Sequence, residues 1–226
     1  MNNSVRSTAR LLGAGLRALL VLTALCGVLY PLAVTGVAQG LFHHRANGSE
    51  VTDGDGRVVG SALIGQRYDL PPGKGEKTPE PDLRWFQPRP SHGLGTNTAN
   101  TRYALTVSGA TNRSGDSAEL LRWVEEAKAA VIEDNSTPGH PVRPADVPPD
   151  AVTSSASGLD PHISPAYARL QVHRVAQRNG LSVEEVGKLV HAHTDGRILG
   201  FMGEPRVNVL ELNIALRELQ KPIGED

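Results

Sequence analysis

The chain has 226 residues, and its 23 Lys and Arg nearly balance 24 Asp and Glu, for a formal net charge of −1 at pH 7. This balance, without a concentrated basic patch, argues against nucleic acid as a partner. Aromatic residues form only 4% of the chain, whereas its 24 glycines and 16 prolines predict many turns and long loops.

The first predicted element is an apolar helix close to the N-terminus. Residues 18–38 contain no charged side chain. At a rise of ~1.5 Å per residue, a helix of this length matches the hydrocarbon core of a bilayer, which is about 30 Å thick. We therefore expect a single transmembrane helix over 11–41, preceded by a cytoplasmic segment over 1–10 and followed by one domain over 42–226.

The charges beside this helix predict its orientation. The first acidic residue of the chain is Glu50, and three arginines precede the apolar core: Arg6, Arg10 and Arg17. Because positive residues near a span stay inside, the N-terminus should be cytoplasmic and the domain extracytoplasmic, anchored in the cell membrane and its lipid. The alternatives are a buried core helix, which the arginines disfavour, and a cleavable signal peptide ending near Gly36 and Ala38, which the length of the apolar run disfavours.

Several residues within the span predict contact with another membrane helix. Pro31 lacks a backbone N–H, so it frees the carbonyl of Gly27 and should bend the helix. Small residues four positions apart allow close approach of a partner helix. The predicted packing residues are Gly27, Tyr30, Pro31, Gly36 and Gly40.

The segment after the span reads as a hairpin followed by loops and a helix. Two consecutive Asp-Gly pairs at 53–56 predict a tight turn before a strand over 57–64. A proline-rich loop follows over 70–83; its GKGEKT stretch lacks the sequence of a phosphate-binding loop. A helix is expected over 116–133, with a second loop over 135–150. The apolar face of the helix over 116–133 comprises Leu120, Leu121, Val124, Ala127 and Val131.

The last third carries strong helix signals. Ser164 as N-cap before Pro165 predicts a helix over 165–178, which Gly180 closes in the left-handed conformation. Ser182 and Glu185 form the pattern of a capping box for the next helix.

The end of the chain completes a mixture of strands and helices. A short strand is expected over 197–201 and a last helix over about 208–220. This helix should bury one apolar face, made of Val209, Leu212, Leu216 and Leu219. The fold class is therefore α+β (mixed α/β), an extracytoplasmic domain anchored by one N-terminal transmembrane helix. The only cysteine, Cys26, lies in the span, so packing alone must hold the domain.

Three groups of residues invite a chemical interpretation. Residues 160–164 (DPHIS) combine an acid, an imidazole and a hydroxyl, but near neighbours on a tight turn rarely form a catalytic triad, and Ser164 is expected to cap a helix. His191 and His193 point apart on a helix, so no metal site is expected. Backbone amides in the loop 108–112 either hold an anion or a partner, or simply form a loop.

Several motifs appear together in one order along the chain. They are Tyr30-Pro31-Leu32 with Thr35-Gly36, GSALIGQ at 60–66, Arg89-Pro90-Ser91, SGLDPHIS at 157–164 and GFMGEPRVNVLELN at 200–213. In these motifs the chain resembles KdpC, the C subunit of the Kdp potassium-transporting P-type ATPase, from the anchor nearly to the C-terminus. It departs from the family where SGGSN followed by LGPSN is usual, since residues 108–115 read SGATNRSG.

The resemblance implies a non-catalytic accessory subunit of an ATP-driven potassium importer. Its partners would be the potassium-conducting A subunit, the ATP-hydrolysing B subunit and the small F subunit. The resemblance also implies a catalytic chaperone that raises the ATP affinity of the B subunit, with ATP as a ligand and potassium handled by the partner. Candidate contact or structural residues are Ser108, Gly109, Asn112, Asp160, Pro161, His162, Ser164, Arg206, Asn208 and Asn213.

The predicted topology restricts this role. If residues 42–226 face outward, they lie across the membrane from the nucleotide domain of the B subunit, so any effect on ATP must pass through the membrane. Two other classes of function stay open at this point. One is a membrane-anchored hydrolase using His162 or Ser164, and the other is a secreted binding module.

Overall fold

The computed structural model describes residues 2–70, 80–90, 95–96, 106–107, 109 and 112–220. Within it the chain divides into two compact units, Met1–Glu50 and Val51–Asp226. Most of the predicted loop at 70–83, from 71 to 79, lies outside the described residues.

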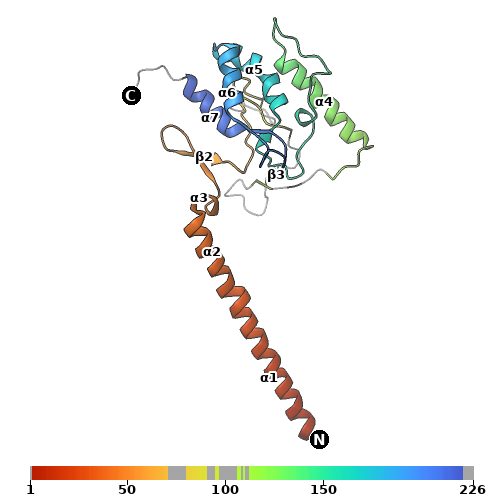
Figure 1. Ribbon diagram of the computed structural model, residues 1–226. Helices are drawn as coiled ribbons and strands as arrows, with labels where there is room; N and C mark the ends of the chain where they lie inside the picture. The colour runs from red at the N-terminus through yellow and green to blue at the C-terminus, as the bar shows by residue number, and fades with distance from the viewer. Residues whose placement is uncertain are drawn as a thin grey trace. The chain divides into compact units, whose positions relative to one another are not determined.

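The first unit is almost entirely helical. Helix α1 (Asn2–Ala24), a π-helical turn (Leu25–Leu29) and α2 (Tyr30–Leu41) follow one another as a continuous rod, and the short α3 (His43–Ala46) comes after them (Figure 1). Over Val5–Leu41 this rod is long and apolar enough to cross a bilayer: its most apolar 18-residue window has a mean hydropathy of 2.1, and no residue of the stretch is buried.

The rod contains a π-helical turn just before Pro31. The N–H of Tyr30 donates to the carbonyl of Leu25, five residues earlier, instead of the usual four. A π-helical turn just before Pro31 changes the register of the backbone bonds where that residue has no N–H to donate. The predicted bend of the helix at Pro31 stays a prediction.

The second unit begins with the expected hairpin. Strands β1 (Glu50–Thr52) and β2 (Val58–Ser61) form a two-stranded sheet. The carboxylate of Asp53 accepts hydrogen bonds from the N–H groups of Asp55 (3.1 Å) and Arg57 (2.9 Å), and these bonds shape the turn. The strand ends earlier than predicted, because residues 62–64 turn away.

Four helices follow the hairpin and pack around the core of the domain. Ser117 caps α4 (Ala118–Asn135), and Ser164 caps α5 (Pro165–Asn179), which ends at Gly180 with φ +67°. The capping box of Ser182 and Glu185 opens α6 (Val183–Ala192) as predicted. The last helix is α7 (Val209–Gln220), and a short 3-10 helix covers Pro149–Ala151.

A small antiparallel sheet joins these helices. Its order is β5 (His162–Ile163), β7 (Arg206–Asn208), β6 (Thr194–Asp195), with Ile163 and Thr194 both opposite Val207. A separate pair is formed by β3 (Gly95–Thr96) and β4 (Thr106–Val107). The predicted strand over 197–201 is wrong, because Leu199 and Gly200 adopt positive φ angles and fold this stretch into the tip of the β6–β7 hairpin.

The core lies where α5, α6 and α7 meet the central strand β7. Its fully buried members include Val175, Val186, Val190, Val207, Leu212 and Leu216. Two residues expected in apolar faces are instead exposed: Leu121 on α4 at 52% and Leu219 on α7 at 42%.

Candidate functional site

A segment without regular structure, residues 82–90, crosses the domain and is here called the strap. Its backbone is held by side-chain amides rather than by a neighbouring strand. Asn213 accepts from the N–H of Phe86 and donates to its carbonyl, both at 2.9 Å. Gln171 does the same for Gln87, at 2.7 and 3.0 Å. Asn213, one of the candidate contact or structural residues, is therefore buried and holds the strap.

A buried guanidinium completes this arrangement. Arg174 donates from Nε to Asn135 (2.8 Å), from Nη2 to Gln171 (2.6 Å), and from Nη1 to the strap carbonyls of Leu83 and Trp85. Burial lowers the pKa of Arg174 to about 10, which still leaves it charged at neutral pH. The Arg174 cation thus links the strap to α5, and the oxygens that accept its hydrogen bonds belong to neutral amides and carbonyls.

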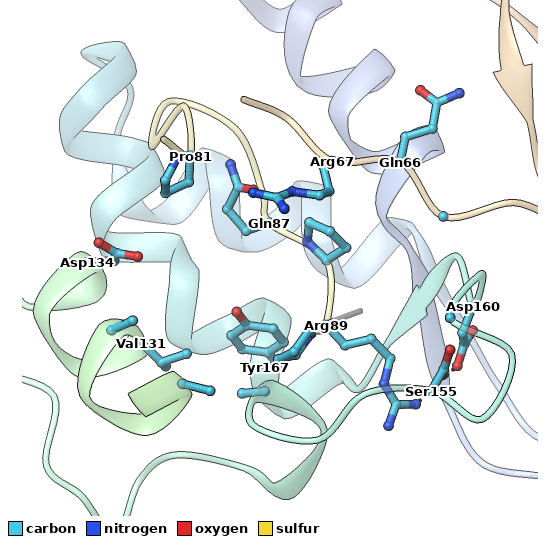
Figure 2. A pocket seen from close by; sticks show the side chains of 17 residues that line it. Gln66, Arg67, Pro81, Gln87, Arg89, Val131, Asp134, Ser155, Asp160 and Tyr167 are labelled. Carbon is cyan, nitrogen blue, oxygen red and sulfur yellow. Dashed lines mark hydrogen bonds and ion pairs between the residues drawn. The ribbon is translucent and has the colours of Figure 1, made fainter. Parts of the chain in front are cut away.

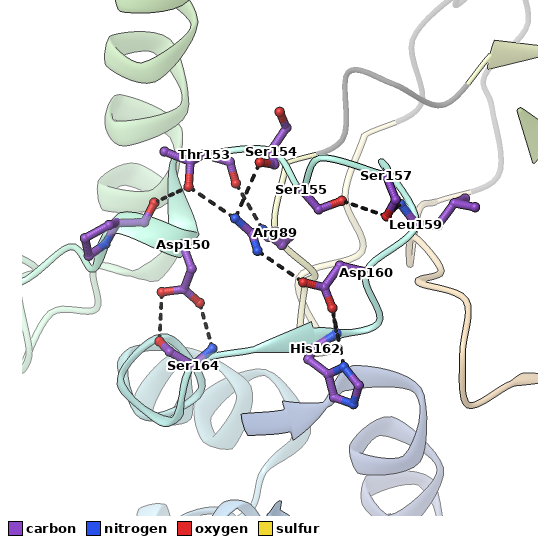
Figure 3. A network of polar contacts seen from close by, with 11 residues as sticks. Arg89, Asp150, Thr153, Ser154, Ser155, Ser157, Leu159, Asp160, His162 and Ser164 are labelled. Atoms are coloured by element: carbon purple, nitrogen blue, oxygen red, sulfur yellow. Dashed lines mark hydrogen bonds and ion pairs between the residues drawn. The ribbon is translucent and has the colours of Figure 1, made fainter. Parts of the chain in front are cut away.

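Arg89, at the end of the strap, connects it to the DPHIS turn (Figure 3). Its Nη1 lies 3.1 Å from Asp160 Oδ2, and its other nitrogens donate to the carbonyls of Thr153 (3.1 Å) and Ser154 (3.4 Å). Asp160 in turn accepts from the N–H of His162 at 3.0 Å and lies 3.3 Å from its Nδ1. These residues form a partly exposed polar network.

Ser164 belongs to a different contact. Its hydroxyl donates to Asp150 Oδ1 at 2.8 Å, and its N–H donates to Asp150 Oδ2 at 2.7 Å. The same hydroxyl accepts from the N–H of Tyr167 at 3.0 Å and so caps α5. In Figure 3 His162 points toward Asp160 and away from Ser164. Among the described residues no imidazole is hydrogen-bonded to Ser164, whose hydroxyl is engaged by Asp150 and Tyr167, so this geometry does not support the hydrolase alternative.

The motifs that carry the resemblance contact one another. Asn208 donates from its amide to the carbonyl of Ala62 at 2.9 Å and accepts from the N–H of Leu210 at 3.1 Å, which opens α7. The carbonyl of Pro161 accepts from Val209 at 3.0 Å. A Cβ at Gly65 would lie 2.6 Å from the backbone oxygen of Asp160, so only glycine fits there.

A cavity of about 330 Å³ lies beside the strap (Figure 2). Asp134 and Tyr167 face it, and burial raises the pKa of both groups. Its two arginines are already engaged, Arg67 with Asp69 at 3.1 Å and Arg89 with Asp160. Both arginines of the described lining are thus already paired with carboxylates, which lowers the positive charge that the cavity offers to an anion.

The other predicted groups are placed as follows. No group of three or more His, Cys, Asp or Glu within the described residues is arranged to hold a metal. Ser108 lies outside those residues, while the N–H of Gly109 donates to the carbonyl of Ser157 at 3.0 Å and Asn112 has φ +50°. Gly109 is therefore attached to the SGLDPHIS motif. Arg206 is exposed and lies 3.6 Å from Asp195.

The packing residues of the apolar helix lie on open surface within their own unit. A Cβ at Gly36 or Gly40 would meet no atom within 4 Å, and one at Gly27 would meet only the methyl group of Thr23 at 3.8 Å. Tyr30 is 67% exposed. This surface of the rod has room for another helix.

Sequence reasoning missed Asp150, Gln171 and Arg174. The last two could have been found, because they are polar residues three positions apart within the apolar stripe of α5, and a buried polar side chain there needs partners. Asp150 leaves no such signal, since it ends a proline-rich loop.

Comparisons with known proteins agree over almost the whole chain. The family model described as "KdpC: K+-transporting ATPase, c chain" matches residues 12–218. A "Potassium-transporting ATPase KdpC subunit" of Streptomyces avermitilis is 71% identical over 219 residues, covering 97% of this chain and 98% of the relative. The protein of the same description from Streptomyces coelicolor is 70% identical (98% and 98%), and that from Kineococcus radiotolerans is 48% identical (96% and 98%).

Proposed function

Because this chain belongs to the KdpC family, the c chains of K+-transporting ATPases, we propose that it assembles the potassium-conducting, ATP-hydrolysing and small F subunits of such a complex. It is a non-catalytic subunit of the Kdp ATPase complex, anchored in the membrane by its N-terminal helix. The observation that carries the assembly role is the apolar rod over Val5–Leu41, which is long enough to cross a bilayer and contains no buried residue.

The rod supports assembly because its surface suits a second helix. Gly36 and Gly40 leave open space beside the backbone, and within a membrane such small residues allow the close packing that drives helix association. Pro31, just after the π-helical turn, has no backbone N–H to donate to the preceding turn, and a carbonyl without its donor favours a protein neighbour over lipid.

The orientation follows from charge. Three arginines precede the apolar core and no acidic residue precedes Glu50, so the domain after the rod faces outward. A subunit changes the ATP affinity of its partner only if it contacts two states of that partner differently. In this proposal those contacts are made in and outside the membrane.

Co-purification from membranes tests the assembly role. The tagged full-length chain should retrieve a P-type ATPase and a large potassium-channel-like protein. Gly27→Leu with Gly36→Leu should reduce that recovery at least about tenfold, since bulky side chains would hold the partner helix off. Gly15→Leu, outside the apolar core, is the matched control. Undiminished recovery with the double variant would exclude helix packing as the assembly contact.

Thiol labelling of intact cells tests the orientation. After Cys26→Ser, a cysteine introduced by Arg143→Cys should react with an impermeant reagent, because the side chain at 143 is 77% exposed. A cysteine introduced by Ser7→Cys, on the other side of the rod, should react only after lysis. The reverse pattern would invert the topology.

A further inference from the structure

The tip of the β6–β7 hairpin, residues 198–202, displays apolar side chains to solvent. Leu199 is 79% exposed, Phe201 72%, Ile198 60% and Met202 50%. Four neighbouring apolar side chains in a loop form a contiguous patch of the kind that marks an interaction site. We call residues 198–202 the apolar tip.

The apolar tip is held in shape by its own backbone. Ile198 and Met202 exchange two hydrogen bonds of 2.9 Å, and the N–H of Gly200 donates to the carbonyl of Arg197 at 3.1 Å. The tip thus presents its side chains on a closed hairpin. Little conformational entropy would be lost if a partner bound it.

Leu199 holds an unfavourable backbone conformation in this tip. Its φ is +54°, a left-handed value that costs a residue with a Cβ roughly 1–2 kcal/mol. Glycine would remove that cost, and Gly200 and Gly203 do occupy the other positive-φ positions nearby. A strained leucine that points into solvent gains nothing within the domain itself, so its side chain is needed for a contact outside it.

The charges around the tip indicate what kind of partner covers it. Arg197 pairs with Glu204 at 2.9 Å, and Arg206 lies 3.6 Å from Asp195. Both cations of the hairpin are thus matched by acids. Loops and helices that lie on lipid surfaces usually add unmatched Lys or Arg for the anionic headgroups, so this neutral hairpin fits a protein surface better.

A polar groove continues from the base of the tip. Glu204, Pro205 and Arg206 line it together with Asp160 and His162 of the network around Arg89. An apolar centre beside a partly exposed polar margin is the usual anatomy of a protein interface. Each side of a stable interface contributes roughly 20–30 residues, so the four side chains of the tip form only part of one. We assign them the role of its central apolar anchor.

We propose that the apolar tip inserts into an apolar pocket of another protein subunit of the same ATPase complex, with the adjoining groove at the rim of that contact. The inference rests on the proposed function and specifies which surface of the domain makes the assembly contact. A second copy of this chain is a poor occupant, because a convex tip cannot fill an identical convex tip.

Photo-crosslinking in native membranes tests the occupant. A photoreactive phenylalanine analogue in place of Phe201 should crosslink the full-length chain to another subunit of the complex. The same analogue in place of Leu121, which is exposed on α4, is the control and should give no such product. Crosslinks from position 201 to lipid alone, to a second copy of the chain, or to no protein would overturn the inference.

Co-purification of variants tests the strength of the contact. Leu199→Gly with Phe201→Ser should lower recovery of the other subunits at least about tenfold. Leu121→Ser with Val183→Ser, two exposed apolar residues elsewhere, should not change it. If the tip variant retrieves as much of the other subunits as the unaltered chain does, the inference about the tip fails while the assembly role stands. If the unaltered chain retrieves no subunit, both fail.

Discussion

The side-chain amide of Gln171 pairs with both the N–H and the carbonyl of Gln87, 84 positions earlier, at 2.7 and 3.0 Å. It thereby does for the strap what a neighbouring strand would do, and Asn213 repeats the arrangement one residue away at Phe86. Arg89 extends from the same strap to Asp160. The groove beside the apolar tip is therefore positioned by buried amides of two helices.

Replacing Gln171 should destabilise the domain strongly. Gln171→Leu leaves the N–H and carbonyl of Gln87 and one N–H of Arg174 buried without partners, at a cost of about 2–4 kcal/mol in unfolding free energy. Gln177→Leu, on the exposed face of the same helix, should change it by less than about 0.5 kcal/mol. Urea unfolding of the full chain in detergent, followed by tryptophan fluorescence, measures both. Equal effects would mean that the strap is not held by this amide.

The two serine caps should differ in their contribution to stability. Ser164→Ala removes an N-cap and the hydroxyl that donates to partly buried Asp150, so we expect a loss of about 1–3 kcal/mol. Ser182→Ala removes the cap of α6, whose partner Glu185 is exposed to water, and should cost only about 1 kcal/mol. Thermal unfolding of the two variants compares them. A smaller loss at Ser164 than at Ser182 would contradict the role given to Asp150.

The stacked rings of His140 and His173 predict a pH dependence of stability. Their centroids are 3.7 Å apart at an interplanar angle of 9°. Burial, and secondarily the His140 imidazole, lower the pKa of His173 below its usual 6.5. The unfolded chain therefore binds this proton at a higher pH than the folded chain does. Stability is fully present above about pH 6.5 and is lost as pH falls from there through the folded pKa.

His173→Phe keeps an aromatic ring in the stack and removes the titrating group. The difference in Tm between about pH 7.5 and pH 5.5 should therefore shrink. His191→Phe, at an exposed position, should leave that difference as it is in the unaltered chain. A difference that His173→Phe leaves unchanged would assign the acid sensitivity to other groups.

Leu199→Gly should separate backbone strain from side-chain contact. Glycine adopts φ +54° freely, whereas Leu199→Ala retains the strain, so the glycine variant should be more stable than the alanine variant by about 1 kcal/mol. Because the leucine side chain is 79% exposed, neither variant should be much less stable than the unaltered chain. A loss of several kcal/mol with both would show that Leu199 packs within the domain.

The elements that sequence alone predicted are those specified by neighbouring residues. The apolar rod depends on a run of uncharged side chains, the β1–β2 turn on Asp53 and the glycines beside it, and the starts of α5 and α6 on Ser164 and Ser182. Each requires contacts only a few positions apart, so the local pattern is sufficient. Residues 198–202 show where a local pattern is not sufficient. The apolar residues there predicted a strand, but two residues with positive φ make this stretch the tip of a hairpin.

The tertiary structure alone decided which polar residues are buried and which apolar residues are exposed. The sequence left open whether Asn213 is a contact or a structural residue, and the structure buries it; Gln171 and Arg174 hold a strap more than 80 positions away. Such pairings join segments far apart along the chain. No local pattern encodes them, because the free energy of each bond depends on the water that the surrounding fold excludes.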